Sequence, residues 1–248
     1  MTTRTIIVVS AGLSQPSSTR LLADRLAAAT ARRLPGETQV SMIELRELAH
    51  DITSNLLTGF ASPALRRAMD QLLCADGLIA VTPLYRGSYN ALFKSFFDVL
   101  DPDALTGKPV LIAATGATAR HSLALEHAIR PLFSYLRAVT VPTAVFAAIE
   151  DWGSARDSAG AFTARIERAA SKLAAAIGQR QPQAEADPYR SVTRSSTCSG
   201  DAERAAPAAP HRSLTRVASL PTTVFATARD ICTSAPPSGS NGRTALSA

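Results

Sequence analysis

The sequence is poor in cysteine: its 248 residues include only Cys74, Cys198 and Cys232. Three cysteines spaced this widely form neither a disulfide framework nor the paired CxxC ligands of a structural zinc site. Long apolar runs are also missing, since residues 6–9 fall far short of the roughly 20 residues that span a membrane. No long apolar stretch precedes a cleavage site near the N-terminus. We therefore expect a protein without export or membrane insertion that works in the reducing cytoplasm.

Charge of one sign is not concentrated anywhere, although the formal net charge is +6. Residues 1–186 carry 19 Lys and Arg against 16 Asp and Glu, and residues 187–248 carry 7 against 4. Neither part contains a dense basic run with interleaved aromatic residues, so we expect no nucleic-acid partner. A mildly basic surface instead attracts phosphorylated ligands.

Three motifs of nucleotide and hydrolase sites are absent. The sequence contains no GxxxxGK[ST], no GxGxxG after its first strand-like run and no GxSxG. These absences argue against a P-loop, a Rossmann dinucleotide site and the nucleophile elbow of a serine hydrolase.

Helical and strand-like periodicity ends near residue 180. Residues 187–248 contain 18 Ser and Thr and six Pro, with only short apolar pieces. Such a segment buries too little apolar surface to offset its chain entropy. We predict a folded domain over residues 1–180 and a disordered, low-complexity tail over residues 181–248. Whether the tail is inert, binds a partner or results from a frameshift stays open.

Strand-like and helix-like segments alternate within residues 1–180. An apolar run of β-branched residues predicts a strand buried on both faces at residues 4–10, and further strands are predicted at residues 37–45, 76–83, 108–116 and 139–148. The segments between and after them predict helices at residues 19–34, 62–75, 88–100, 121–138 and 159–178. Ser62 and Pro63 mark the start of the second helix, Pro131 should kink the fourth, and Gly178 should end the last. The alternation predicts an α/β fold with a doubly wound, five-stranded parallel sheet.

The loop after the first strand is rich in hydroxyl groups. Five Ser or Thr side chains lie between residues 10 and 19, directly before a predicted helix. A helix N-terminus offers unpaired N–H groups and the positive end of a dipole, so hydroxyls there can help to bind a phosphate. One hydroxyl is explained as an ordinary N-cap. Because five exceed that need, we expect a phosphate site in this loop.

Two further loops at the carboxyl ends of strands should meet the first, because ligands of doubly wound sheets bind there. Residues 82–90 include Tyr85, Gly87 and Tyr89, which suit a planar ligand, although the tyrosines alone are better explained by packing. Residues 115–122 are mostly small and leave room for a ligand near the backbone.

Two groups of charged or metal-ligating residues have simpler interpretations. Lys94 and Asp98 are four residues apart on a predicted helix and are explained as a weak surface pair. His121, Glu126 and His127 fall on different sides of a helix, so we expect no zinc site.

Three segments, residues 10–20, 82–101 and 114–138, together resemble the NAD(P)H-dependent FMN reductases. The resemblance covers about residues 4–178, and its most specific part is Pro-x-Tyr-x-Gly-Ser at residues 83–88. Within the family, the chain most resembles the actinobacterial flavin reductases of two-component monooxygenase systems. The family more often has two glycines where this chain has Gly116 and Ala117.

The resemblance implies a flavodoxin-like fold, a homodimer or homotetramer, and hydride transfer from NAD(P)H to N5 of FMN, which carries the chemistry. The reduced FMN would serve a partner monooxygenase, and no side chain is needed as an acid or base. The residues implied in the phosphate loop are Ser10, Gly12, Ser17, Ser18 and Thr19. Those implied beside the ring are Pro83, Leu84, Tyr85, Arg86, Gly87 and Ser88 on one side and Thr115, Gly116, Ala117 and Thr118 on the other.

Other readings of the same scaffold stay open. A quinone, azo or chromate reductase would keep FMN bound through its cycle, whereas an FMN reductase releases it as product. A flavodoxin-type electron carrier fits less well, because flavodoxins are usually strongly acidic. The choice between NADH and NADPH is not decided by the sequence.

Overall fold

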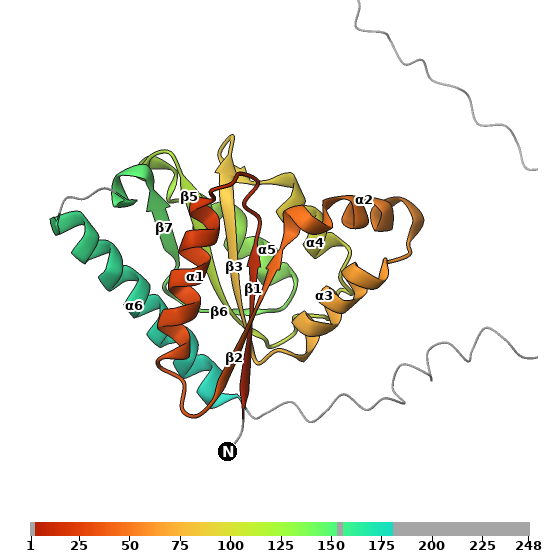
Figure 1. Cartoon of the computed structure of the whole chain (residues 1–248), viewed down its shortest axis with the longest axis horizontal. Coiled ribbons are helices and arrows are strands. Elements are labelled where there is room, and N and C mark those ends of the chain that lie inside the picture. The colour runs from red at the N-terminus through yellow and green to blue at the C-terminus, as the bar shows by residue number, and fades with distance from the viewer. Residues whose placement is uncertain (1–2, 153–155, 181–248) are drawn as a thin grey trace, which may run out of the picture. The chain divides into compact units, whose positions relative to one another are not determined.

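The computed structural model describes residues 3–152 and 156–180 (Figure 1), and the statements below concern these residues. The chain divides into two units, Met1–Cys198 and Ser199–Ala248. The second unit and the tail predicted at residues 181–248 lie outside the described residues.

A parallel sheet forms the centre of the domain, with the strand order β2-β1-β3-β5 and with β6 and β7 both paired to β5. Its strands are β1 (Arg4–Ser10), β2 (Thr38–Glu44), β3 (Gly77–Tyr85), β5 (Pro109–Gly116), β6 (Val139–Thr140) and β7 (Val145–Ala148). The order confirms the predicted doubly wound α/β fold. The predicted fifth strand at residues 139–148 is interrupted, with Pro142 between β6 and β7.

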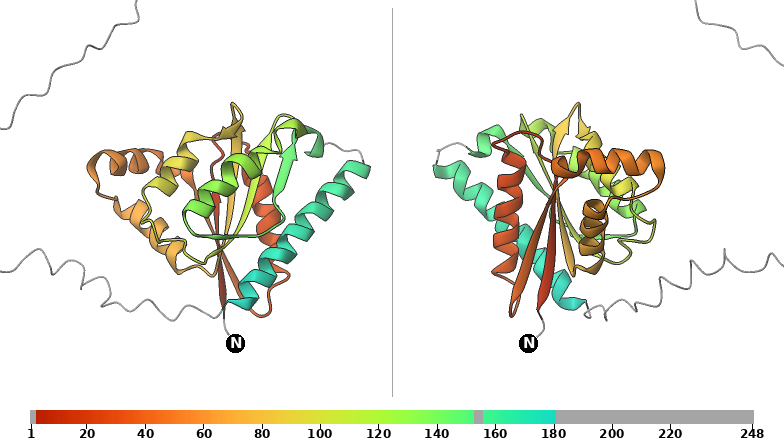
Figure 2. Two further views of the ribbon diagram at one scale, coloured as in Figure 1. Left: turned by 180° about the vertical axis from the view of Figure 1, so that it is seen from behind. Right: turned by 45° about the vertical axis from the view of Figure 1, so that its right-hand side comes forward.

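Helices cover both faces of the sheet (Figures 1 and 2). On one face lie α1 (Ser18–Ala31) and α6 (Arg156–Gln179); on the other lie α2 (Ala49–Thr58), α3 (Pro63–Cys74), α4 (Ala91–Asp98) and α5 (Arg130–Tyr135). Successive strand side chains point to opposite faces. Val8 therefore packs in the core with α1 and α6, while Val9 packs in the core with α3 and α4. This two-sided burial explains the apolar runs of β1, β3 and β5, whereas β2, at the edge of the sheet, is only partly buried.

One predicted helix start agrees with the structure and another does not. Ser62 caps α3, accepting from the N–H of Leu65 at 3.1 Å, and Pro63 is its first residue, as predicted. The helix predicted from residue 88 begins only at Ala91. The intervening residues form a hairpin, in which β4 (Ser88–Tyr89) pairs antiparallel with the end of β3.

The predicted helix at residues 121–138 is divided. A 3₁₀ turn, η2 (Ala119–His121), is followed by a π-helix, η3 (Leu125–Ile129), and then by α5. Pro131 lies in the first turn of α5, directly after the π-helix, so the expected irregularity is present at this point. The last helix continues through Gly178 to Gln179, so Gly178 does not end it.

One helix was missing from the prediction: α2 is a regular helix that ends at Gly59, whose φ of 78° suits a glycine. None of the described helices is long and apolar enough to cross a membrane. The two ends of the described domain lie together, because the Arg4 guanidinium donates to the carbonyl oxygen of Arg180 at 3.4 Å.

Candidate functional site

One cavity of about 410 Å³ lies at the carboxyl ends of β1, β3, β5 and β7. β1 is placed between β2 and β3, so the chain order reverses beside it, where doubly wound sheets bind their ligands. The first loop contributes Leu13, Ser14, Ser18 and Thr19, β3 contributes Pro83, Leu84 and Tyr85, and the end of β5 contributes Thr115, Gly116 and Ala117. The three loops chosen from the sequence therefore meet around one space.

The implied site residues divide into two groups. Those that line the cavity are Ser18, Thr19, Pro83, Leu84, Tyr85, Thr115, Gly116 and Ala117. Those outside its lining are Ser10, Gly12, Ser17, Arg86, Gly87, Ser88 and Thr118. Ser10 is buried at the end of β1, and Thr118 caps η2 by accepting from the N–H of Arg120.

The first loop closes tightly on the start of α1. Ser17 is the N-cap, and its Oγ accepts a hydrogen bond from the N–H of Arg20 at 3.2 Å. A Cβ placed on Gly12 would stand 2.1 Å from that Oγ, so a larger residue here would displace the capping hydroxyl. The N–H groups of Ser18 and Thr19 come earlier in the turn than that of Arg20, where an α-helix has no acceptor of its own. This helix end can therefore receive an anion beside the Ser14 and Ser18 side chains.

A buried pair of hydroxyls joins the first loop to the loop after β5. Thr19 Oγ1 and Thr115 Oγ1 are 2.9 Å apart, and either can be the donor. Both threonines are buried. Part of the hydrogen-bonding capacity of Thr19 is thus used to fix the distance between two walls of the cavity.

The hairpin after β3 places Gly87 in a tight turn. Arg86 and Gly87 form its tip, with φ of 51° and 82°. Among the described residues, none would come within 4 Å of a Cβ on Gly87. Gly87 is therefore explained by the turn, while Tyr85, half exposed, reaches the cavity wall.

Asn90 connects two of the loops and was not singled out from the sequence. Its Nδ2 donates to the carbonyl oxygen of Ala11 at 2.7 Å, and its Oδ1 accepts from the N–H of Phe93 at 2.7 Å. Asn90 is buried, so both bonds are shielded from water. Its position before a helix is a recognisable N-cap signal, but the bond to Ala11 spans 79 residues and has no sequence signature.

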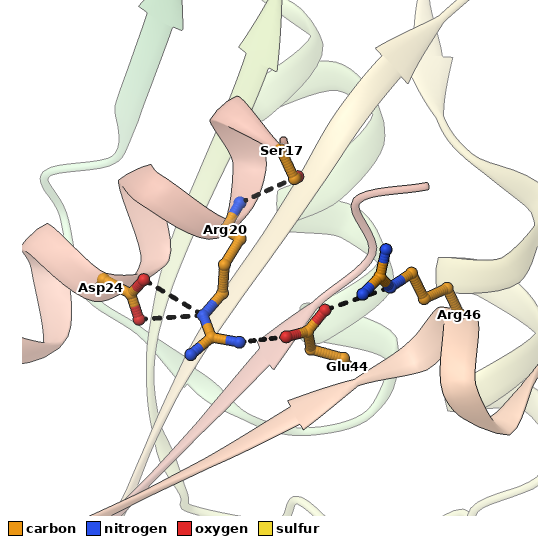
Figure 3. A network of polar contacts seen from close by, with 5 residues as sticks. All are labelled: Ser17, Arg20, Asp24, Glu44 and Arg46. Atoms are coloured by element: carbon orange, nitrogen blue, oxygen red, sulfur yellow. Dashed lines mark hydrogen bonds and ion pairs between the residues drawn. The ribbon is translucent and has the colours of Figure 1, made fainter. Parts of the chain in front are cut away.

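A chain of charged side chains joins the start of α1 to the end of β2 and to Arg46 just after it (Figure 3). Arg20 Nε lies 3.0 Å from Asp24 Oδ1, and the same guanidinium is paired with Glu44 at the end of β2. Oε2 of Glu44 also lies 3.3 Å from Nε of Arg46. The hydrogen bond to Asp24 raises the pKa of Arg20. Arg20 is directed to these acids and is not among the cavity-lining residues.

The cavity has a fourth side that the sequence analysis missed. Ala147 and Ile149, at the end of β7 and just after it, and Trp152 complete its lining. The rule that selected the other loops, the carboxyl end of a parallel strand, also applies to this one. In the described part of the chain no Asp, Glu, His, Lys or Arg lines the cavity, so it is uncharged apart from the positive end of α1. The arrangement suits a planar ligand that carries a phosphate.

Comparison with known proteins gives consistent results. The sequence model of a family described as NADPH-dependent FMN reductase matches residues 4–153, a range that contains every cavity-lining residue. An FMN reductase (NADPH) of Pseudomonas aeruginosa is 39% identical over 175 residues, which cover 71% of this chain and 93% of that protein. The NADH-dependent FMN reductase SfnE of Pseudomonas putida is 39% identical over 173 residues, or 70% and 92% of the two chains. The crystal structure of an oxidoreductase from Corynebacterium diphtheriae is 48% identical with a TM-score of 0.68, covering 72% of this chain and 99% of that one.

Proposed function

The chain belongs to the NADPH-dependent FMN reductase family, and on this basis we propose that it reduces FMN with NAD(P)H in the cavity at the carboxyl edge of the sheet. The observation that carries the assignment is the meeting of three loops around one uncharged space at the start of α1. FMN, when bound, supplies the atom that accepts the hydride.

The cavity has the features that FMN requires. Its phosphate would be held by the hydroxyls of Ser14, Ser18 and Thr19 and the N–H groups at the start of α1, whose dipole favours an anion. The ring would lie between residues 83–85 and residues 115–117, where the lining is largely apolar. With no acidic side chain among the described lining residues, a phosphate meets no repulsion there.

The side chains act by binding and orientation. Among the described residues that line the cavity, none is a carboxylate, imidazole or amine able to exchange a proton near neutral pH. The Thr19–Thr115 pair and the Asn90–Ala11 bond keep the loops at fixed separation. Walls joined in this way would orient a bound ring for reaction with a nicotinamide.

The assignment is tested by following NADH and NADPH oxidation with and without added FMN. We expect oxidation of at least one coenzyme to depend on FMN concentration and to saturate. If neither coenzyme is oxidised at any FMN concentration, the assignment is wrong. The relatives do not predict the preferred coenzyme, because one is named for NADPH and another for NADH.

We further propose that FMN leaves as product and serves a flavin-dependent monooxygenase, as in the actinobacterial systems that the sequence resembles. Exposed side chains at the cavity mouth support release: Leu13 and Tyr85 are about half exposed and Ile149 is 69% exposed. A product flavin predicts colourless purified protein and kinetics in which FMN behaves as a second substrate. Yellow protein that keeps its flavin through turnover would instead indicate the quinone, azo or chromate type of reductase.

We also propose that the protein is a homodimer or homotetramer and that it works in the cytoplasm. Association is supported by exposed apolar side chains, among them Leu57, Phe60 and Tyr135, each at least 80% exposed. Light scattering coupled to gel filtration measures the mass directly. A monomer at micromolar concentration would remove this part of the proposal.

A further inference from the structure

The turn after β7 separates two cavities. Trp152 lines the cavity assigned to FMN, together with Ile149. It also lines a second cavity of about 440 Å³ between α1 and α6, whose walls include Arg25 and Thr163. Trp152 therefore borders both spaces.

Two neighbours hold the Trp152 indole. The guanidinium carbon of Arg25 lies 5.1 Å from the centroid of the Trp152 ring. The Phe162 ring meets the indole edge to face, with 5.2 Å between centroids and an interplanar angle of 75°. Phe162 is fully buried, so it provides a fixed support. Cation–π and edge-to-face contacts are attractive and directional, and together they set the plane of the indole.

Asp151 anchors the same turn through its carboxylate. Oδ2 accepts a hydrogen bond from the N–H of Ala148 at 2.8 Å. Oδ1 is ion-paired with Arg165 of α6, and only 14% of the Asp151 side chain is exposed. The carboxylate therefore ties the end of β7 to α6, one residue before Trp152.

We propose that Trp152 is a ligand-contacting residue that forms an aromatic wall for bound FMN, and that Asp151 and Arg165 are positioning residues for this wall. The inference rests on the proposed function, since it places FMN in the cavity. An aromatic side chain that is already fixed adds contact area and loses little conformational freedom when the ligand binds.

Trp152 is the only tryptophan in the sequence, so tryptophan emission reports this side chain alone. We expect saturating FMN to lower the rate constant for acrylamide quenching of that emission, because the ligand covers the indole. The rate constant is taken from emission lifetimes, which separates coverage from energy transfer to the flavin. An unchanged rate constant, in protein shown by flavin fluorescence polarisation to be saturated with FMN, would overturn the proposal.

Affinity supplies the second measurement. Replacing Trp152 by Ala should raise the dissociation constant for FMN about five- to tenfold, the loss expected for one aromatic contact, and Trp152→Phe should recover part of it. If the folded Trp152→Ala variant has an unchanged dissociation constant for FMN, Trp152 does not contact the ligand. If the wild-type protein does not bind FMN at all, the proposed function fails, which is a distinct result.

The positioning role needs a matched control. Asp151→Asn removes the ion pair with Arg165 while keeping an acceptor for Ala148. Asp76→Asn is the matched control at the opposite edge of the sheet, because Asp76 likewise pairs with an arginine, Arg4, and accepts a hydrogen bond from a backbone N–H, that of Thr5. We expect Asp151→Asn alone to weaken FMN binding and to increase acrylamide access to Trp152. If neither property changes in Asp151→Asn, Asp151 is not a positioning residue, and a lowered melting temperature on its own would show that it is merely structural.

Discussion

At the scale of single residues, the hydroxyls at the start of α1 are the most direct test of the phosphate position. Replacing Ser18 and Thr19 together by Ala should weaken FMN binding by about 1–3 kcal/mol, the usual value for lost hydrogen bonds to a charged group. The measurement is a flavin fluorescence titration. Thr53→Ala, which removes an exposed hydroxyl bonded only within α2, serves as the control. A dissociation constant for FMN that is unchanged in the double variant would show that the phosphate binds elsewhere.

Thr19 also has a structural partner, and its two effects can be separated. Losing the Thr19 hydroxyl leaves that of Thr115 buried without its partner, which should lower the free energy of unfolding by about 1–3 kcal/mol. Replacing both threonines by Val removes donor and acceptor together and should cost less stability than either single change, as measured by urea unfolding. FMN affinity should remain low in every variant that lacks the Thr19 hydroxyl.

Lys108 provides a pH-dependent test at the opposite edge of the sheet. It is 1% exposed, and its Nζ donates to the carbonyl oxygens of Leu73, at 3.1 Å, and Ala75, at the end of α3. Burial, with a smaller contribution from Arg180, lowers the pKa of Lys108 to about 8, while Asp76 and Cys74 act in the opposite direction.

The sign of the effect follows from proton binding. Between the lowered pKa of about 8 and the ordinary value of 10.5, the unfolded chain holds the Lys108 proton and the folded chain has released it. The contribution of Lys108 to stability therefore rises with pH across this window. We expect the free energy of unfolding, measured against Lys108→Met at each pH, to increase by up to about 3 kcal/mol from below pH 8 to pH 10.5. A difference independent of pH would contradict the lowered pKa.

At the scale of elements, the β3–β4 hairpin is sensitive to its tip. Gly87→Val should destabilise the protein by about 1–2 kcal/mol, since a β-branched residue does not readily adopt a φ of 82°. Gly87→Asn should be tolerated better, because Asn accepts left-handed backbone. Thermal melting and FMN titration on both variants are the measurements. A Val variant that melts normally yet no longer binds FMN would show instead that Gly87 faces the ring.

The same hairpin shows what sequence reasoning could and could not predict. The strands were readable because burial on both faces demands uninterrupted apolar residues. The hairpin was not, because its first tip residue is Arg86, an arginine in left-handed backbone that no local preference indicates. The helix α2 was missed for a related reason: β-branched Ile52 and Thr53 and the polar Ser54 and Asn55 obscure its apolar side.

The part of the site that is built from loops at the carboxyl ends of strands could be predicted from the sequence. Three of its loops were chosen by the rule that ligands lie at the carboxyl edge, and the structure brings them together. Trp152 and Asn90 were not chosen, because each acts through partners far along the chain, Arg25 in one case and Ala11 in the other. Spacing within a sequence carries no information on such contacts.

At the scale of the whole molecule, we expect the domain over residues 1–180 to be sufficient for folding and catalysis. The Corynebacterium diphtheriae structure is covered over 99% of its length by 72% of this chain. Deleting residues 187–248 should therefore change the melting temperature by only a few degrees and leave FMN-dependent coenzyme oxidation intact. Both properties, and the mass by light scattering, should be compared with the full chain. Loss of folding or of the native mass would show that the deleted residues belong to the structural unit.

The contact between Arg4 and Arg180 makes the domain a candidate for circular permutation. Because β1 begins where α6 ends, a short glycine–serine linker could join these points, and new termini could be opened at the exposed turn of Gly59 and Phe60. Circular permutation succeeds where the original ends lie close together and the new ends fall in an exposed surface turn. All the cavity loops would be kept whole in such a permuted chain. The domain could then be inserted, through that turn, into a loop of another protein.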